Sequence, residues 1–212
     1  MRIYLDNAST TPVSESVVDV MTHILKEDFG NPSSIHWHGR KTKSHIENAR
    51  KIVSRAINAS ISEVFFTSSA TEANNMVLKN AVDHLHITRI ISSPTEHHCV
   101  LHTLLYLHQF KNTEVIFLHV DERGNPDLNQ LEKLLSDQKG NTLVSLMHGN
   151  NEIGTMTNIH RVGEICKKYH VLFHCDAVQT IGKYHMDIQQ DNISFLTASA
   201  HKFHGPKGSG FV

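Results

Sequence analysis

Small polar and ionisable residues follow five short apolar runs of this chain, at the point where each run ends. The five segments are SSATEA (68–73), SPTEHH (93–98), HGNNEIG (148–154), DAVQT (176–180) and SAHK (199–202). In an open α/β sheet, ligands bind outside the carboxyl ends of the strands. If the apolar runs are parallel strands, the five segments meet at one edge and predict a binding site there.

The first segment has the composition of an anion-binding turn. Ser68, Ser69, Ala70 and Thr71 lead into a predicted helix, whose free amide groups and hydroxyls can bind a phosphate. The same residue types are also common in an ordinary helix cap. No GxxxxGK[ST] or GxGxxG motif accompanies them, which disfavours a P-loop and a dinucleotide site.

An acid and a lysine extend the chemistry of this edge. Asp176 ends an apolar run, where a carboxylate can bind a protonated ring nitrogen, although it could also be solvated in a loop. Lys202 lies between His201 and a glycine-rich run; a desolvated lysine can lose its proton and attack a carbonyl carbon, whereas most lysines are surface charges. Phosphate-binding turn, acid and lysine together are what pyridoxal 5′-phosphate (PLP) requires.

Seven β-rich runs supply the strands that must position these residues. Each of the first six is followed by a helical segment, and this alternation predicts a mainly parallel sheet with helices on both faces. The expected fold class is therefore three-layer α/β/α with about seven strands. The last run follows its predecessor too closely for a helical crossover, so it should pair antiparallel or belong to a sheet that the chain does not complete. The runs are residues 63–67, 88–92, 114–120, 141–147, 170–176, 192–198 and 208–212.

Composition and charge narrow the class of protein. Twenty basic residues stand against twenty-one acidic ones with no basic stretch, so neither a nucleic acid nor a membrane surface is expected as a partner. The first residues lack the apolar run of a signal peptide. Cys99, Cys166 and Cys175 are widely separated and odd in number, which favours a reducing, cytoplasmic location.

Eighteen histidines raise the question of a metal site. Pairs such as His97 and His98 occur, but there is no HExxH motif and no cysteine close enough to complete a finger-type site. No metal is expected, and most of these histidines are interpreted as surface or compositional residues.

The motifs, taken together, resemble those of the cysteine desulfurases, which are PLP enzymes of the class V aminotransferase group with the fold-type I architecture. The resemblance runs in family order along nearly the whole chain. It implies that residues 1–13 normally join a second, smaller domain, that residues 14–212 form the PLP-binding large domain, and that the C-terminal small domain is absent from a truncated chain. The matching segments are YLDNASTTP (4–12), FGNPSS (29–34), FTSSATEANN (66–75), TEHHCV (95–100), MHGNNEIG (147–154), HCDAVQTIGK (174–183) and SAHKFHGPKGSG (199–210).

The resemblance also implies roles for individual residues. Lys202 would carry PLP covalently and move a proton during the reaction, and His97 would stack on the pyridine ring and assist acid–base steps. Asp176 would pair with the pyridine nitrogen. The remaining cofactor contacts would be made near the ring hydroxyl and the substrate by Gln179 and Asn151, and at the phosphate by Ala70, Thr71, Ser199 and His201.

The implied activity is the conversion of L-cysteine to L-alanine with formation of an enzyme persulfide. The sulfur would pass to an acceptor or scaffold protein for iron–sulfur cluster or thio-cofactor assembly, and the full-length protein would be a homodimer. Two alternatives remain open: a selenocysteine lyase or another class V PLP enzyme, and a catalytically silent PLP-binding remnant.

Three departures from the family pattern accompany the resemblance. Ser69 and Ala200 stand where glycine is common, which would cost stability if either position needed a positive φ. Desulfurase chemistry also needs a cysteine and an arginine from the C-terminal part, beyond residue 212. Cys99 is a weak candidate to replace that thiol. The chain by itself is therefore expected to be inactive, and only marginally stable.

Overall fold

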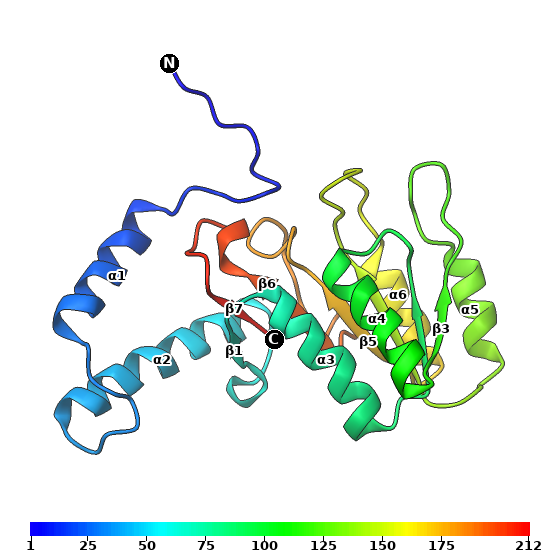
Figure 1. The fold of residues 1–212 in the computed structure, drawn as a ribbon, viewed down its shortest axis with the longest axis horizontal. Helices are drawn as coiled ribbons and strands as arrows, with labels where there is room; N and C mark the ends of the chain where they lie inside the picture. Colours follow the sequence, from blue (N-terminus) through cyan, green and yellow to red (C-terminus); the bar gives the residue numbers. More distant parts are fainter.

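A seven-stranded sheet runs through the computed structural model, which describes residues 1–212 (Figure 1). The strand order is β1-β7-β6-β5-β4-β2-β3. Strands β2 to β6 are parallel to one another, whereas β7 is antiparallel to both β6 and β1. The mainly parallel sheet and the antiparallel last strand confirm the sequence prediction. The strands are β1 (Phe66–Thr67), β2 (Arg89–Ser92), β3 (Glu114–Phe117), β4 (Thr142–Met147), β5 (Leu172–Asp176), β6 (Phe195–Ser199) and β7 (Gly210–Phe211).

Helices cover both faces of the sheet, which confirms the three-layer α/β/α fold class. Helices α3 (Ala70–Leu85) and α4 (His98–Lys111) pack side by side on one face. Helices α5 (Leu128–Ser136) and α6 (Ile159–Lys168) pack on the other (Figure 1).

Alternating strand residues explain the two layers of core. On β4, Leu143 belongs to the cluster under α3 and α4, whereas Val144 belongs to the cluster under α5 and α6. Ile90 and Ile91 divide in the same way on β2. Because successive side chains of a strand point to opposite faces, a continuous apolar run is what a sheet buried on both sides requires.

The link between β5 and β6 corrects one expectation. A helical segment was predicted after every one of the first six runs, but residues 177–194 form turns and no α-helix, and only a 3₁₀ turn at Ala200–Lys202 follows β6. One of these turns is stabilised at Asp187, whose carboxylate accepts hydrogen bonds from the amides of Gln189 and Gln190. Side-chain acceptors of this kind stabilise turns at the expense of a helix.

Two N-terminal helices extend away from the sheet. Helix α1 (Glu15–Glu27) buries none of its residues, and α2 (Trp37–Ala56) links it to the main body (Figure 1). Short 3₁₀ turns complete the fold: η1 (Ile61–Glu63) precedes β1, and η2 (Ala200–Lys202) follows β6. None of the helices combines the length and apolar character that crossing a membrane demands.

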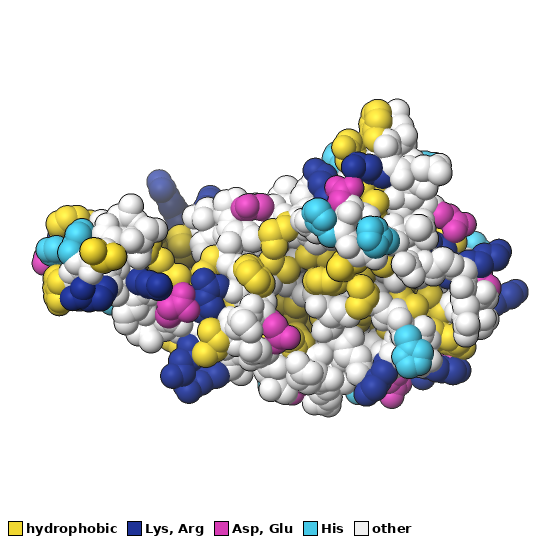
Figure 2. Space-filling view, turned by 90° about the horizontal axis from the view of Figure 1, so that it is seen from below, with side chains coloured by type: hydrophobic (Ala, Val, Ile, Leu, Met, Phe, Trp, Pro, Cys, Tyr) yellow, Lys and Arg dark blue, Asp and Glu magenta, His cyan; other side chains and the backbone are white.

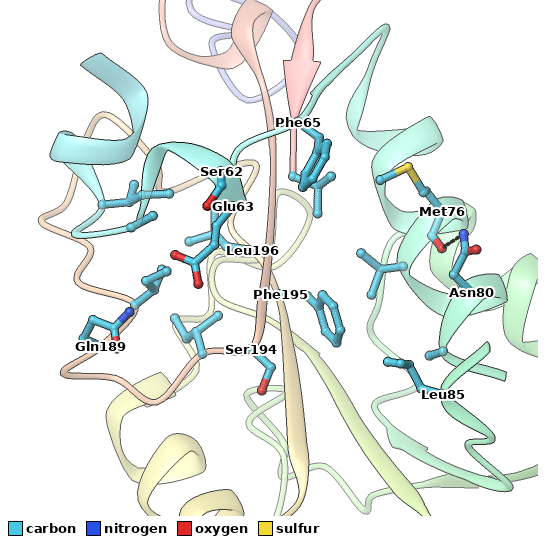
Figure 3. A pocket seen from close by; sticks show the side chains of 17 residues that line it. Ser62, Glu63, Phe65, Met76, Asn80, Leu85, Gln189, Ser194, Phe195 and Leu196 are labelled. Carbon is cyan, nitrogen blue, oxygen red and sulfur yellow. Dashed lines mark hydrogen bonds between the residues drawn. The ribbon is translucent and has the colours of Figure 1, made fainter. Parts of the chain in front are cut away.

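Apolar side chains also remain exposed on the body of the protein. Figure 2 shows hydrophobic side chains between charged residues on the face seen from below. Figure 3 shows a groove between α3 and β6, lined mainly by hydrophobic residues that include Phe65, Met76, Leu85 and Phe195. This groove lies apart from the polar strand ends, so it has no part in the chemistry predicted there.

The core predicts a large effect for one aromatic substitution. Phe173 on β5 is fully buried in the larger cluster. We expect Phe173→Ala to lower the free energy of unfolding by about 3–5 kcal/mol, because it removes buried contacts and leaves a cavity. Phe110→Ala, at a position that is 65% exposed on α4, should change it by less than about 0.5 kcal/mol. Urea denaturation of both variants measures the difference, and equal effects would contradict the burial described here.

Candidate active site

One cavity of about 180 Å³ lies at the carboxyl ends of the parallel strands. All nine residues predicted from the sequence to bind the cofactor line it: Ala70, Thr71, His97, Asn151, Asp176, Gln179, Ser199, His201 and Lys202. Five further residues complete the lining: Ser69, from the predicted anion-binding turn, Cys99, the weak candidate for the thiol, and Asn74, Met147 and Val178, which were not predicted. The strand order explains the convergence, because β4, β5 and β6 are parallel neighbours whose carboxyl ends lie at the same edge of the sheet.

Lys202 ends η2, directly after β6, and reaches into the cavity. Its ammonium group donates a hydrogen bond to the carbonyl of Ala8 at 2.5 Å. Partial burial lowers the pKa of Lys202, and the positive charge of Lys183 lowers it further. A lysine with a lowered pKa loses its proton more readily, which is the property that a nucleophilic amine needs.

Asp176 is the last residue of β5 and is buried. Its carboxylate accepts hydrogen bonds from the amide of Val178 at 3.0 Å and from Nδ2 of Asn74 at 2.8 Å. No lysine, arginine or histidine forms an ion pair with it. Burial raises the pKa of Asp176, because the charged form is costly without a cation. The cavity therefore contains a carboxylate that a cationic ring nitrogen could neutralise.

Asn74 is a functional residue that sequence reasoning missed. It lies on the buried face of α3 and connects two strand ends, since its amide oxygen also accepts from Oγ1 of Thr197 at 2.6 Å. A signal was present in the sequence: Asn74 occupies a buried position of α3, next to Ala73 and one turn before Val77 and Leu78. A polar residue in an apolar helical stripe indicates a buried hydrogen-bond partner.

His97 precedes α4 and caps it. Its Nδ1 accepts a hydrogen bond from the backbone amide of Cys99 at 3.1 Å, and Sγ of Cys99 lies 3.0 Å from the same nitrogen. Because Nδ1 acts as an acceptor, the proton of the neutral ring is on Nε2. The cap thereby fixes both the position and the tautomer of the imidazole at the cavity.

Residues predicted to bind a phosphate lie at the start of α3. Ala70 and Thr71 are its first two residues, and amides at these positions have no acceptor within the helix. Ser199 and His201 approach from β6 and η2 to line the same cavity. The geometry is suited to an anion, because amides and the positive end of the helix dipole point toward it.

Gly210 on β7 permits this close arrangement. A Cβ at this position would lie 2.6 Å from the carbonyl oxygen of Ala198 and 2.9 Å from the backbone of Ser69. No side chain fits so close to two backbone segments, so glycine is required where β7 passes the turn before α3.

The two predicted departures from glycine cause no backbone strain. Ser69 has a φ of −171°, which is extended backbone that any residue adopts, and Ala200 is not among the residues with positive φ. Ala200 instead fits against Gly205, where a Cβ would approach the Ala200 Cβ to 2.6 Å. Neither position has a positive φ, so the condition under which these substitutions would cost stability is not met.

Gln179 and Asn151 lie on the loops that follow β5 and β4. Nε2 of Gln179 donates to the carbonyl of Ala8 at 2.9 Å, the same oxygen that Lys202 contacts. Asn151 lines the cavity from a turn after β4. The N-terminal segment thus lies over the lysine and the glutamine.

The three cysteines differ in their access to the cavity. Cys166 and Cys175 are buried in the core, and burial raises the pKa of Cys166 to about 12. Cys99 is half-buried and lines the cavity, but burial raises its pKa too. A thiol with a raised pKa is a poor nucleophile, because the thiolate is the reactive form.

The residues present fit a PLP cofactor. A buried carboxylate without a cation, a lysine of lowered pKa and an anion-binding helix start surround the same cavity. These three features match the ring nitrogen, the aldehyde and the phosphate of PLP.

Comparison with known proteins agrees with this chemistry. The family model "Aminotransferase class-V" matches residues 3–212. The chain belongs to the aminotransferase class-V family. This confirms the resemblance inferred from the motifs, and the cysteine desulfurases to which the chain is similar are PLP-dependent.

Three relatives illustrate the similarity. A "Cysteine desulfurase IscS" of Dictyoglomus turgidum is 44% identical over 211 residues, covering 99% of this chain and 53% of the relative. Among solved structures, a "NifS-like protein" matches with a TM-score of 0.94 and 42% identity, covering 100% of this chain and 58% of that one. "SspA in complex with cysteine" matches with a TM-score of 0.93 and 34% identity, covering 99% and 60%. The chain thus spans about half the length of the curated relatives it matches.

The histidines do not form a cluster of three or more metal-binding side chains. No group of three or more histidine, cysteine, aspartate or glutamate side chains converges closely enough to hold a metal ion. His174, for example, is fully buried on β5 between Ser145 and Thr197, and burial lowers its pKa to about 3. It acts as a neutral hydrogen-bonding core residue.

The Asn74–Asp176 contact leads to a test of the site's electrostatics. We expect Asn74→Ala to raise the pKa of Asp176, because the carboxylate loses one of its two donors. The free energy of unfolding should fall by about 1–3 kcal/mol. A carbon-detected NMR titration of the carboxyl group measures the pKa. Asn80→Ala, on an exposed position of the same helix, serves as the control, and an unchanged pKa in Asn74→Ala would refute the assignment.

Proposed function

We propose that this chain is the PLP-binding part of a cysteine desulfurase. The observation that carries the proposal is the cavity that joins Lys202 to a buried, unpaired Asp176 carboxylate. The similarity to cysteine desulfurases over 99% of the chain supports the same reaction class. Residues 1–13 would join a second domain, and residues 14–212 would form the large domain.

Two charged residues of this chain would tune the cofactor. PLP, when bound, supplies an electron sink for the electron pair released at the substrate's α-carbon. Asp176 would hold a proton on the ring nitrogen, since a buried carboxylate favours a cationic partner. Lys202 would bind the cofactor and afterwards accept and return the proton at the α-carbon, because its lowered pKa keeps the amine available.

The uncharged residues would orient the cofactor. His97 would lie against one face of the ring, held there by its cap on α4. The amides of Ala70 and Thr71 would bind the phosphate, together with Ser199 and His201. Asn151 and Gln179 would contact the ring hydroxyl and the substrate from the other side of the cavity.

L-cysteine is the substrate that we propose, and a related solved structure is described as being in complex with cysteine. In the balanced reaction, L-cysteine and an enzyme thiol give L-alanine and an enzyme persulfide, whose outer sulfur passes to an acceptor or scaffold protein. Iron–sulfur cluster or thio-cofactor assembly would use that sulfur. We further propose a homodimer for the whole protein and a cytoplasmic location, in keeping with three unpaired cysteines.

We also propose that residues 1–212 bind the cofactor but do not complete the reaction by themselves. Cys166 and Cys175 are buried, and Cys99 is half-buried with a raised pKa, so no cysteine is a free and reactive persulfide acceptor. Transfer of sulfur from L-cysteine requires an enzyme thiol, and residues 1–212 therefore offer no suitable cysteine for this step.

A colour test distinguishes PLP binding from its absence. Purified protein incubated with PLP should be yellow, and Lys202→Ala should lose the protein-bound colour, because the amine that attaches the cofactor is gone. Lys133→Ala removes an exposed lysine of α5 and should leave the colour unchanged. Absorbance after gel filtration is the measurement. A colourless wild-type protein, or a yellow Lys202→Ala protein, would contradict the assignment of PLP as the cofactor.

Turnover provides a separate test. We expect the 212-residue chain loaded with PLP to release little or no sulfide from L-cysteine, even with an external thiol as reductant, because it offers no accessible low-pKa thiol. Sulfide is measured against a complete cysteine desulfurase at equal concentration. Release at a comparable rate would contradict the proposal that another thiol is required, and release abolished by Cys99→Ala would identify that residue as the acceptor.

A further inference from the structure

Glu96 is a buried carboxyl group beside the cavity that the proposed reaction leaves without a role. It is 6% exposed and directly precedes His97. Its Oε1 accepts a hydrogen bond from the backbone amide of Met147 at 2.7 Å, whereas its Oε2 is buried and has no hydrogen-bond partner. No cation pairs with it. An ionised carboxylate in such surroundings is costly unless something compensates it.

The contact with Met147 has a topological reason. Strand β4 pairs with β2 only from Thr142 to Val144, and β2 ends at Ser92. The amide of His148 faces β5, where it donates to the carbonyl of Asp176. Since amides along a strand alternate in direction, the amide of Met147 faces the opposite side, where β2 has already ended. Glu96 supplies the acceptor that the missing strand would have provided.

A second hydrogen bond joins the same two loops. Nδ2 of Asn150 donates to the carbonyl of Thr95 at 2.8 Å. Immediately afterwards His97 is tied to α4 by its cap on the amide of Cys99. The segment that carries the imidazole is therefore held to the end of β4 on one side and to the start of α4 on the other.

We infer that Glu96 is a positioning residue that holds His97 at the cavity, and that it does so as an uncharged carboxylic acid whose oxygen replaces a strand carbonyl opposite Met147. The part of this inference that concerns PLP rests on the proposed function. The neutral state has an electrostatic benefit, because Asp176 lies close enough to interact with Glu96. With Glu96 uncharged, a single negative charge remains to meet the cofactor's ring nitrogen.

The surroundings of Glu96 favour the neutral form from every side. The titratable groups that act on it, or that it acts on, are Asp176 and Cys175 from β5 and Cys99 from α4. None of these carries a positive charge. Burial, and then the charge of Asp176, raises the pKa of Glu96 well above its ordinary value of 4.5, against the lowering effect of the Met147 amide.

Two substitutions separate the hydrogen bond from the charge. Glu96→Gln keeps an acceptor oxygen and removes the ionisable proton, whereas Glu96→Ala removes both. Ser92→Ala is the control: it deletes another buried hydrogen bond near the end of β2, from Oγ to the carbonyl of Ser145, and should leave His97 in place. Each protein is measured without cofactor and during titration with PLP.

The first readout needs no cofactor. The folded wild type keeps the Glu96 proton at pH values where the unfolded chain has released it, so its free energy of unfolding falls as the pH rises above 4.5. Glu96→Gln lacks this dependence and should therefore gain stability relative to wild type as the pH rises above 4.5. Hydrogen exchange at the Met147 amide should stay slow in Glu96→Gln and become faster in Glu96→Ala. Parallel pH profiles for wild type and Glu96→Gln would overturn the uncharged state.

The second readout is the affinity for PLP, followed by absorbance. Glu96→Gln should bind within about twofold of wild type, and Glu96→Ala about tenfold more weakly, because a lost buried hydrogen bond releases His97. Ser92→Ala should bind as wild type does. Glu96→Ala with wild-type affinity and a protected Met147 amide would overturn the positioning role. If wild type itself binds no PLP, the proposed function fails, while amide exchange and the pH profile still decide the role of Glu96.

Discussion

The site depends on one register of parallel strands. Met147 on β4 lies opposite Asp176 on β5, and both strands end at this pair, whereas β6 continues past Thr197, the partner of Asp176, to Ser199. Backbone polar groups cannot continue a ladder beyond that level, and the loops that follow must satisfy them with side chains. Side chains from loops and helices gather at this edge for that reason. The hydrogen bond from the backbone amide of Met147 to Glu96 is a consequence of this constraint.

Burial changes the pKa values of the ionisable residues at this edge of the sheet, and these changes make the site chemically distinctive. An ionised carboxylate at a strand end would be stabilised by water, but Asp176 is buried and has only neutral hydrogen-bond donors. The same desolvation lowers the pKa of Lys202 and raises that of Cys99. Burial therefore shifts the amine and the thiol toward their neutral forms, and it makes the ionised form of Asp176 costly unless a cation lies beside it. A PLP ring nitrogen meets that need, whereas the thiol is left unreactive.

Each functional group is held by residues from elements far apart in the sequence. Ala8 from the N-terminal segment contacts both Lys202 and Gln179, and Thr11 donates its backbone amide to the carbonyl of His201. Ala8 and Thr11 thus contact residues that line the cavity, although no element of regular structure includes them. This arrangement couples the order of the N-terminal segment to the position of the lysine loop.

The sequence by itself determined the class of fold and the membership of the cavity. Apolar runs of strand length, each ending in small polar residues, were sufficient to place Lys202, Asp176 and Ala70 at one edge, because parallel strands share the direction of their carboxyl ends. Only the tertiary structure decided the partners of those residues. The link between β5 and β6 forms turns instead of a helix. Asn74 binds the carboxylate of Asp176, 102 residues away in the chain, and Glu96 binds the amide of Met147, 51 residues away. Such contacts depend on the residue at which each strand ends. Residue type and spacing do not show which distant segments of the chain meet there.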